Sequence, residues 1–277
     1  MAASPDHCYR HPREETRIRC SRCDRPICPE CMNPAPVGHH CPTCVGEARR
    51  SVRRPLAPIR RLRRLSLTTI LLAVILAVFV VEIARGGLRD LGVLVDMGAM
   101  VPALVEDGQY WRLVTAIFLH AGPLHLLFNV YALVIFGNLV EEAFGTVRFA
   151  AVYFVTGFAA SAASFAFGSE GRVAVGASGA IFGLLGAWLT YNWRRRELSM
   201  AQANVRMALL LIGINLVFGL SVRGIDNTAH VGGLIAGVLA GLAAEGFGGR
   251  AMRTASRVGG LALILGGALA LVLWRIG

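Results

Sequence analysis

The sequence predicts an all-α, polytopic membrane protein with a small zinc-binding domain at its N-terminal end. Two observations predict this class. Of the 277 residues, 55% are hydrophobic and 16% are charged, with a mean hydropathy of +0.57. Apolar runs of about twenty residues, the length that crosses a bilayer, recur from Leu67 onward. The second observation is that all 7 cysteines lie before residue 45, outside the apolar part.

Residues 1–46 carry enough candidate ligands for two tetrahedral zinc ions. Three cysteine pairs have C-x-x-C spacing and one cysteine–histidine pair has C-x-x-H spacing, a pattern typical of zinc sites. The ligands are Cys8, His11, Cys20, Cys23, Cys28, Cys31, Cys41 and Cys44. An extracellular disulfide knot is the alternative, but the odd number of cysteines and the repeated C-x-x-C spacing favour metal. A domain this short has almost no core, so we expect its folding to depend on the metal.

The excess of positive charge indicates interaction with a membrane surface. The net charge is +11 and comes from arginine alone, because the chain contains no lysine. Residues 47–65, "EARRSVRRPLAPIRRLRRL", are predicted to be a flexible linker that also anchors on anionic lipid. The first residues lack an apolar h-region, so no cleavable signal peptide is expected. No aromatic stacking platform accompanies the basic residues, so we expect no nucleic-acid partner, and favour a cytosolic protein partner or a regulatory role for the zinc domain.

Seven membrane spans are predicted, at about 67–84, 121–140, 148–167, 177–193, 206–222, 229–246 and 258–275. The arginine-rich segments all fall on one side if the N-terminus is cytoplasmic, which leaves the C-terminus outside a plasma or inner membrane. The segment 85–120 is too broken by glycine, proline and charge to span. It is predicted to lie at the outer interface, with Tyr110 and Trp111 at headgroup depth.

Polar residues within the spans are costly in lipid, so each is a functional candidate. The predicted topology brings Ser178, His230 and the pair His125 and Asn129 to the outer end of the bundle. A hydroxyl, an imidazole and hydrogen-bond donors at one level are what acyl transfer requires. Taken singly, a serine in a span is more often a packing residue, and a histidine more often bonds neighbouring helices or lines an ion pathway. Small residues at four-residue intervals would let spans 4 and 6 pack closely; they are Gly179, Gly183, Gly233, Gly237 and Gly241.

Four motifs in order carry a resemblance to a known family. "GASGAIFG" and "AHVGGLIAG", preceded by "YWRLVTAIFLHAGPLHLLFNVYAL", closely resemble the rhomboid family of intramembrane serine proteases, over roughly residues 108–246. The resemblance implies a six-helix core at 66–247, followed by a cytoplasmic loop and a seventh transmembrane helix at 248–277. It also implies a serine endopeptidase that cleaves transmembrane segments of membrane proteins near the outer face, without a catalytic cofactor.

The resemblance also implies roles for particular residues. Ser178 is the nucleophile and His230 the general base of a dyad that has no carboxylate, so Asp226 is not expected to join it. The implied supporting residues are His125, Asn129 and Gly176 around the oxyanion site, and Phe182, whose ring stacks on the histidine. Motif residues with implied structural roles are Trp111, Arg112, His120 and Glu141.

The order of the zinc ligands resembles a B-box-type finger. That resemblance implies cross-braced ligation, with Cys8, His11, Cys28 and Cys31 on one ion and Cys20, Cys23, Cys41 and Cys44 on the other. The sequential alternative joins the first four ligands on one ion and the last four on the other. His39 or His40 could also replace one ligand.

Two other functions remain open at the level of the sequence. A catalytically dead, rhomboid-like binder of membrane proteins would lack the serine or the histidine, and both are present. A small-solute transporter would use Ser178 and His230 in its pathway, but the chain shows no inverted repeat or paired broken helices.

Overall fold

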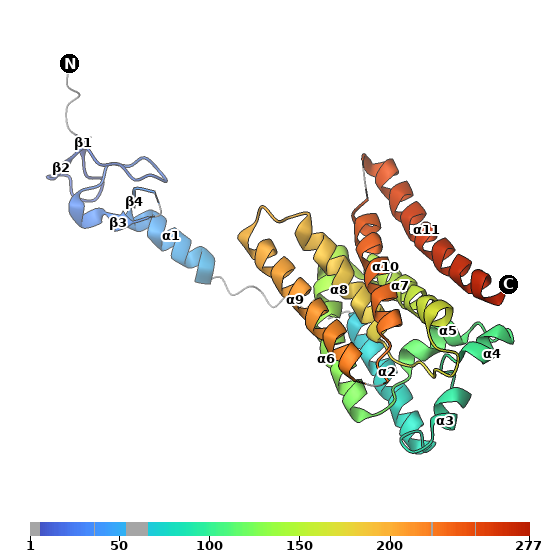
Figure 1. Ribbon diagram of the computed structural model, residues 1–277. Coiled ribbons are helices and arrows are strands. Elements are labelled where there is room, and N and C mark those ends of the chain that lie inside the picture. Colours follow the sequence, from blue (N-terminus) through green and yellow to red (C-terminus); the bar gives the residue numbers. More distant parts are fainter. Residues whose placement is uncertain (1–5, 36, 54–65, 223, 247) are drawn as a thin grey trace. The chain divides into compact units, whose positions relative to one another are not determined.

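The computed structural model describes residues 6–35, 37–53, 66–222, 224–246 and 248–277 (Figure 1). The chain divides into two compact units, Met1–Arg64 and Leu65–Gly277, and each is described by itself. The division falls at the C-terminal end of the predicted linker. Residues 54–65 of that linker lie outside the described part of the chain.

The N-terminal unit is a small set of turns around its cysteines. Strand β1 (Asp6–His7) pairs with β2 (Glu15–Thr16), and β3 (Asn33–Pro34) pairs with β4 (His39–His40), both antiparallel. A short helix η1 (Pro29–Cys31) and the helix α1 (Pro42–Arg53) complete it. The buried residues described in this unit are Thr16, Ile27 and the cysteines other than Cys23.

Helix α1 corrects the predicted start of the flexible linker. The linker was expected from residue 47, but α1 continues to Arg53. The residues from Glu47 onward include glutamate, alanine and arginine, which favour helix, and the next helix-breaking residue is Pro55.

The second unit contains seven helices at the predicted spans. They are α2 (Leu67–Ala84), α6 (Pro123–Phe144), α7 (Thr146–Phe167), α8 (Ser178–Trp193), α9 (Ser199–Ser221), α10 (Asn227–Glu245) and α11 (Arg250–Ile276). Among the described residues, six of these helices are long and apolar enough to cross a membrane, and α8 is the exception. The prediction of a polytopic, all-helical membrane protein is confirmed. Helices α9 and α11 begin earlier than predicted, because their first turns are polar and lie outside the apolar runs.

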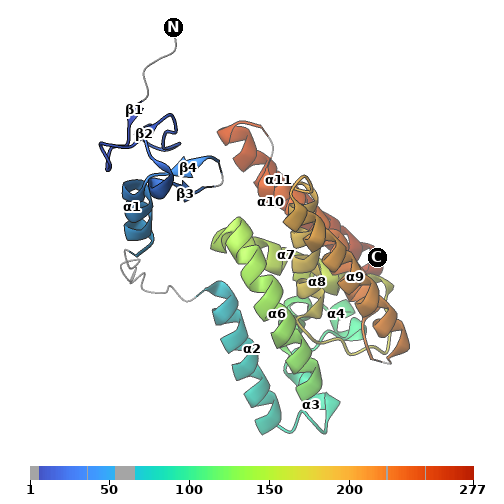
Figure 2. The ribbon, with the colours of Figure 1, turned by 90° about the vertical axis from the view of Figure 1, so that its left-hand side faces the viewer.

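Helix α8 is the centre of the bundle. It has only 16 residues, or about 24 Å, less than the ~30 Å hydrocarbon core of a bilayer. It packs against α6, α7, α9 and α10, and most of its residues are buried. Helix α2 lies beside α6 (Figure 2), and α11 packs against α7 and α10. The shortness of α8 therefore leaves its first residue, Ser178, inside the bundle rather than in lipid.

The segment that was predicted to lie at the outer interface forms short helices. These are α3 (Leu91–Asp96), α4 (Pro102–Glu106), α5 (Arg112–Thr115) and η2 (Ala116–Phe118). Gly98, with φ of +107°, separates α3 from α4, and Pro102 starts α4. None of these helices is long enough to span, as predicted.

Glycines let α8 and α10 meet backbone to backbone, as the four-residue intervals predicted. A Cβ atom at Gly233 would overlap the carbonyl oxygen of Gly179, and one at Gly237 would overlap the backbone of Gly183. Gly183 itself faces α7, where a Cβ would overlap Thr156. The glycines of α8 thus allow close contact with both α10 and α7, and the packing of these three helices depends on them.

We predict that Gly237→Ala destabilises the bundle by about 1–3 kcal/mol, because the added methyl has no space against Gly183. Thermal unfolding in detergent micelles measures this. Gly266→Ala on α11 is the matched control, since a Cβ there meets nothing within 4 Å, and it should not lower the midpoint. Equal midpoints for the two variants would contradict the packing.

Candidate active site and metal-ligand clusters

Ser178 and His230 lie in hydrogen-bonding contact. The Nε2 atom of His230 is 2.9 Å from the Oγ atom of Ser178. Ser178 is the first residue of α8 and His230 lies in the first turn of α10. The close approach of these helices at their glycines therefore brings the two side chains together. A base within hydrogen-bond reach of a hydroxyl is the arrangement that activates a serine nucleophile.

The imidazole of His230 is oriented by a ring, not by a carboxylate. The ring of Phe182, one turn after Ser178, stacks on it with a centroid distance of 4.3 Å and an interplanar angle of 10°. Among the described residues, the Nδ1 atom of His230 has no hydrogen-bond partner. Asp226 therefore makes no triad with this histidine.

His125 and Gly176 lie beside the serine. Gly176 has φ of +123°, and a Cβ there would lie 2.8 Å from Nε2 of His125 and 3.8 Å from Oγ of Ser178. Only glycine fits this position. Asn129 is buried and donates from Nδ2 to the carbonyl oxygen of His125, at 2.9 Å. The Oδ1 atom of Asn129 has no partner in the described part of the chain.

The loop before Ser178 is fixed by backbone hydrogen bonds. Met100 and Ala174 exchange two of them, at 3.0 and 2.8 Å, and Gly176 donates to the carbonyl oxygen of Ala116 at 2.9 Å. The segment 85–120 thereby holds the loop that leads to Ser178. A cavity next to Ser178 is lined by residues of this loop and by Ser161, Ser164 and Asp226.

Trp111 and Arg112 hold the outer interfacial segment together. The buried guanidinium of Arg112 donates to the carbonyl oxygens of Val95 and Ala99, at 2.6 and 2.9 Å, and to Gln109 at 2.8 Å. It also lies over the ring of Trp111, 4.6 Å from its centroid. Burial lowers the pKa of Arg112, whereas the charge of Asp96 raises it. None of these interactions involves Ser178 or His230. Their role is to hold α3 and α5 together.

Glu141 joins three helices at the opposite end of α6 from His125. Its carboxylate accepts hydrogen bonds from the backbone N–H groups of Leu67 and Thr68, at 2.9 and 3.0 Å. It also accepts from the hydroxyls of Thr68 and Thr146, at 2.8 and 2.9 Å. Four donors at the starts of α2 and α7 thus converge on one side chain.

Glu82 is a buried polar residue that sequence reasoning missed. It lies near the end of α2, and its Oε1 atom accepts from the backbone N–H of His120 at 3.0 Å. Neither ring nitrogen of His120 has a partner among the described residues, and its ring lies 5.2 Å from that of His125. Glu82 is the only acidic residue in the apolar run of the first predicted span, and this was the sequence signal that could have identified it.

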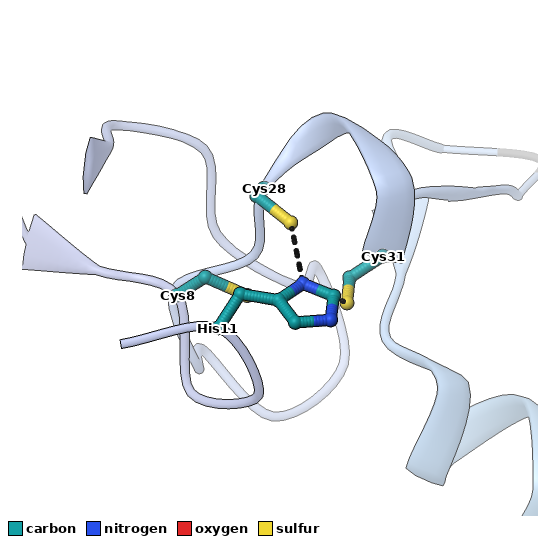
Figure 3. A group of neighbouring side chains, drawn as sticks. All are labelled: Cys8, His11, Cys28 and Cys31. Atoms are coloured by element: carbon teal, nitrogen blue, oxygen red, sulfur yellow. Dashed lines mark hydrogen bonds between the residues drawn. The ribbon is translucent and has the colours of Figure 1, made fainter. Parts of the chain in front are cut away.

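The cysteines and His11 gather into two clusters. Cys8, His11, Cys28 and Cys31 form one, and Cys20, Cys23, Cys41 and Cys44 the other, each with its ligand atoms within 4.8 Å of one another. This is the cross-braced grouping. In the first cluster (Figure 3), Nδ1 of His11 lies 3.1 Å from Sγ of Cys28 and 3.6 Å from Sγ of Cys31. His39 and His40 belong to neither cluster.

The sulfur spacing fits a tetrahedral ion better than disulfides. In the second cluster Sγ of Cys23 is 3.7 Å from that of Cys41, and Sγ of Cys20 is 3.9 Å from that of Cys44. A disulfide needs about 2.05 Å, whereas Zn–S bonds of ~2.3 Å hold tetrahedral sulfurs about 3.8 Å apart. Burial would raise the pKa of the Cys20 thiol, but backbone N–H groups of Cys41, Arg22 and Cys23 lower its pKa to about 6. A thiolate is the form that binds metal.

The fold and the site together define a multi-pass helical membrane protein with a serine and a histidine in hydrogen-bonding contact. The family model described as "Rhomboid domain" matches residues 107–245, about half of the chain. The chain therefore belongs to the rhomboid family. The match begins just before Trp111 and Arg112 and ends with α10, so it includes Ser178 and His230.

Curated relatives share this region. Rhomboid protease GluP of Bacillus subtilis is 42% identical over 169 residues, which are 61% of this chain and 32% of that protein. RHOMBOID-like protein 5 of Arabidopsis thaliana is 42% identical over 149 residues, 52% of this chain and 47% of that protein. Rhomboid-like protease 1 of Toxoplasma gondii is 34% identical over 156 residues, 54% of this chain and 52% of that protein. The chain thus spans about a third to a half of the length of these relatives.

We predict that Glu141→Gln lowers the free energy of unfolding by about 2–3 kcal/mol, because the amide NH₂ would face donors that now meet a carboxylate. Thermal unfolding in detergent measures the loss. Glu142→Gln, a neighbour with an exposed side chain, is the control and should change stability by less than about 0.5 kcal/mol. An equal effect of the two substitutions would contradict the assignment.

Proposed function

We propose that the protein is an intramembrane serine endopeptidase that works through the dyad of Ser178 and His230. The observation that carries this proposal is the 2.9 Å contact between Nε2 of His230 and Oγ of Ser178, inside a bundle of membrane helices. The stacked ring of Phe182 supports it, because an imidazole without a carboxylate partner needs another restraint on its orientation.

Acylation would begin with neutral His230. Its Nε2 accepts the Oγ proton of Ser178 while Oγ attacks the carbonyl carbon of the scissile peptide bond. The resulting oxyanion would face the start of α8, whose first backbone N–H groups have no partner within the helix, and the imidazole of His125. Protonated His230 then gives its proton to the leaving amine. Water, deprotonated by the same histidine, hydrolyses the acyl-enzyme.

The proposed substrates are transmembrane segments of other membrane proteins. A helical substrate hides its carbonyl groups in backbone hydrogen bonds, so it must unwind before Ser178 can attack. Helix-breaking or small residues near the scissile bond would therefore favour cleavage.

The proposed orientation has a cytoplasmic N-terminus, an outer C-terminus and cleavage near the outer face of a plasma or inner membrane. The arginines between α8 and α9 and at the start of α11 support it by the positive-inside rule. The N-terminal unit would then lie in the cytosol, where thiols stay reduced and a protein partner could bind it.

We predict that Ser178→Ala lowers cleavage of a model transmembrane substrate in liposomes at least about 1,000-fold. A fluorophosphonate should label the parent protein at Ser178 and fail to label the variant. Ser221→Ala, an exposed serine at the end of α9, is the matched control and should retain full activity. Retained cleavage by Ser178→Ala would end the proposal, whereas a parent protein that neither cleaves nor is labelled would favour a binder or a transporter.

We also propose that the two clusters of the N-terminal unit each bind one structural Zn²⁺. The donors support this: three thiolates with one imidazole, and four thiolates, are both common zinc ligand sets. Backbone N–H groups of Cys41 and Cys44 point at Sγ of Cys20 and Cys41, at 3.2 and 3.4 Å, and stabilise thiolate charge. Zinc would hold the unit together and take no part in peptide hydrolysis.

Paired cysteine substitutions in the full chain test this ligation. Cys8→Ser/Cys31→Ser disables one cluster and should leave one zinc ion per chain of the two, measured by elemental analysis after desalting. Cys8→Ser/Cys20→Ser disables both clusters and should leave none. Sequential ligation predicts the reverse result for the two variants. Parent protein without zinc would contradict the metal itself.

A further inference from the structure

Asp226 joins three elements around the active site. It is the N-cap residue of α10, and its Oδ1 atom accepts from the backbone N–H of Ala229 at 3.0 Å. The same carboxylate pairs with Nη1 of Arg172 at 2.9 Å and accepts from the hydroxyl of Ser164. Ser164 belongs to the last turn of α7, and Arg172 to the loop that leads to Ser178.

The position of this cluster matters because both reacting side chains lie at helix starts. Ser178 is the first residue of α8, and His230 is in the first turn of α10. First turns lack part of their hydrogen bonds and are the least rigid part of a helix. The backbone N–H of His230 donates to the carbonyl oxygen of Asp226 at 3.1 Å, so the cap and the base share one turn.

The contacts of the Asp226 carboxylate are structural and do not include the imidazole of His230. Its two oxygens are taken by Ala229, Arg172 and Ser164, and it does not reach Nδ1 of His230. Its side chain is 14% exposed and that of Arg172 is 28% exposed, so the pair is partly withdrawn from water. The pairs of Arg275 with Glu106 and Glu170 differ, because those two carboxylates are 42% and 88% exposed. An exposed pair contributes little.

We propose that Asp226, with Arg172 and Ser164, positions the dyad by tying the loop before the nucleophile to the first turn of the helix that carries the base. Asp226 acts through the backbone of α10 and Arg172 through the loop that ends at Ser178; neither is a catalytic residue. This inference rests on the proposed protease function.

Kinetics of the full-length protein with a model transmembrane peptide in liposomes test the proposal. Asp226→Asn keeps a residue that caps helices well but removes the charge that binds Arg172. Arg172→Met removes the other partner. Each should lower kcat about 10-fold, with KM changed less than about two-fold, because small misplacements of reacting groups slow chemistry rather than binding. Fluorophosphonate labelling of Ser178 should slow by the same factor.

Coupling separates positioning from general loss of structure. The double variant Arg172→Met/Asp226→Asn should be no slower than Asp226→Asn alone, because both substitutions break one pair. Arg172→Lys keeps the charge and should recover kcat to within about three-fold of the parent. The matched control is Arg275→Met, which removes the exposed pairs with Glu106 and Glu170 and should leave kcat unchanged.

Three results would overturn the proposal: parent-like kcat in Asp226→Asn and Arg172→Met, additive losses in the double variant, or an equal loss in Arg275→Met. If Asp226→Asn or Arg172→Met does not fold, Arg172→Lys decides. This variant keeps the positive charge, so a kcat far below that of the parent would also overturn the proposal. Cleavage that survives Ser178→Ala would instead overturn the protease function. Parent-like Asp226→Asn beside an inactive Ser178→Ala would overturn this inference alone.

Discussion

Helices α8 and α10 approach so closely that the backbone of Gly183 occupies the place of a Cβ atom at Gly237. In lipid the hydrophobic effect does not drive helices together, because the lipid tails are as apolar as the side chains. Association of the helices therefore depends on close packing and hydrogen bonds. The glycines supply that packing, and they also set the distance between Ser178 and His230. A single larger residue on this face would separate the helices and the two side chains together. Stability and reactive geometry therefore share one constraint.

Polar residues in the bundle gather at helix ends, where they satisfy backbone groups. Glu141 binds the starts of α2 and α7, and Asp226 caps α10. Arg112 does the same for carbonyl groups of the outer interfacial segment. The contact between Ser178 and His230 also lies at helix ends, because Ser178 is the first residue of α8 and His230 is in the first turn of α10.

Much of this could be predicted from the sequence. Hydropathy located the helices, glycine intervals located the α8–α10 contact, and C-x-x-C spacing located the metal ligands. Helix ends were less predictable, since the polar first turns of α9 and α11 carry no hydropathy signal. Glu82 and Ser164 were missed, because their partners lie far away in the chain and no local pattern links them. Asp226 was expected only to stay out of the dyad, and its actual contacts depend on how α7, α10 and the loop pack.

A dyad without a carboxylate must restrain its imidazole by other means. Phe182 limits the tilt of the ring of His230, but stacking leaves the ring free to slide in its own plane. The hydrogen bond to Ser178 opposes sliding only while the serine itself stays in place. Both side chains therefore depend on the backbone turns that carry them. The ion pair of Asp226 and Arg172 links the N-cap of α10 to the loop before Ser178, and so ties these two parts of the backbone together without a hydrogen bond to Nδ1 of His230.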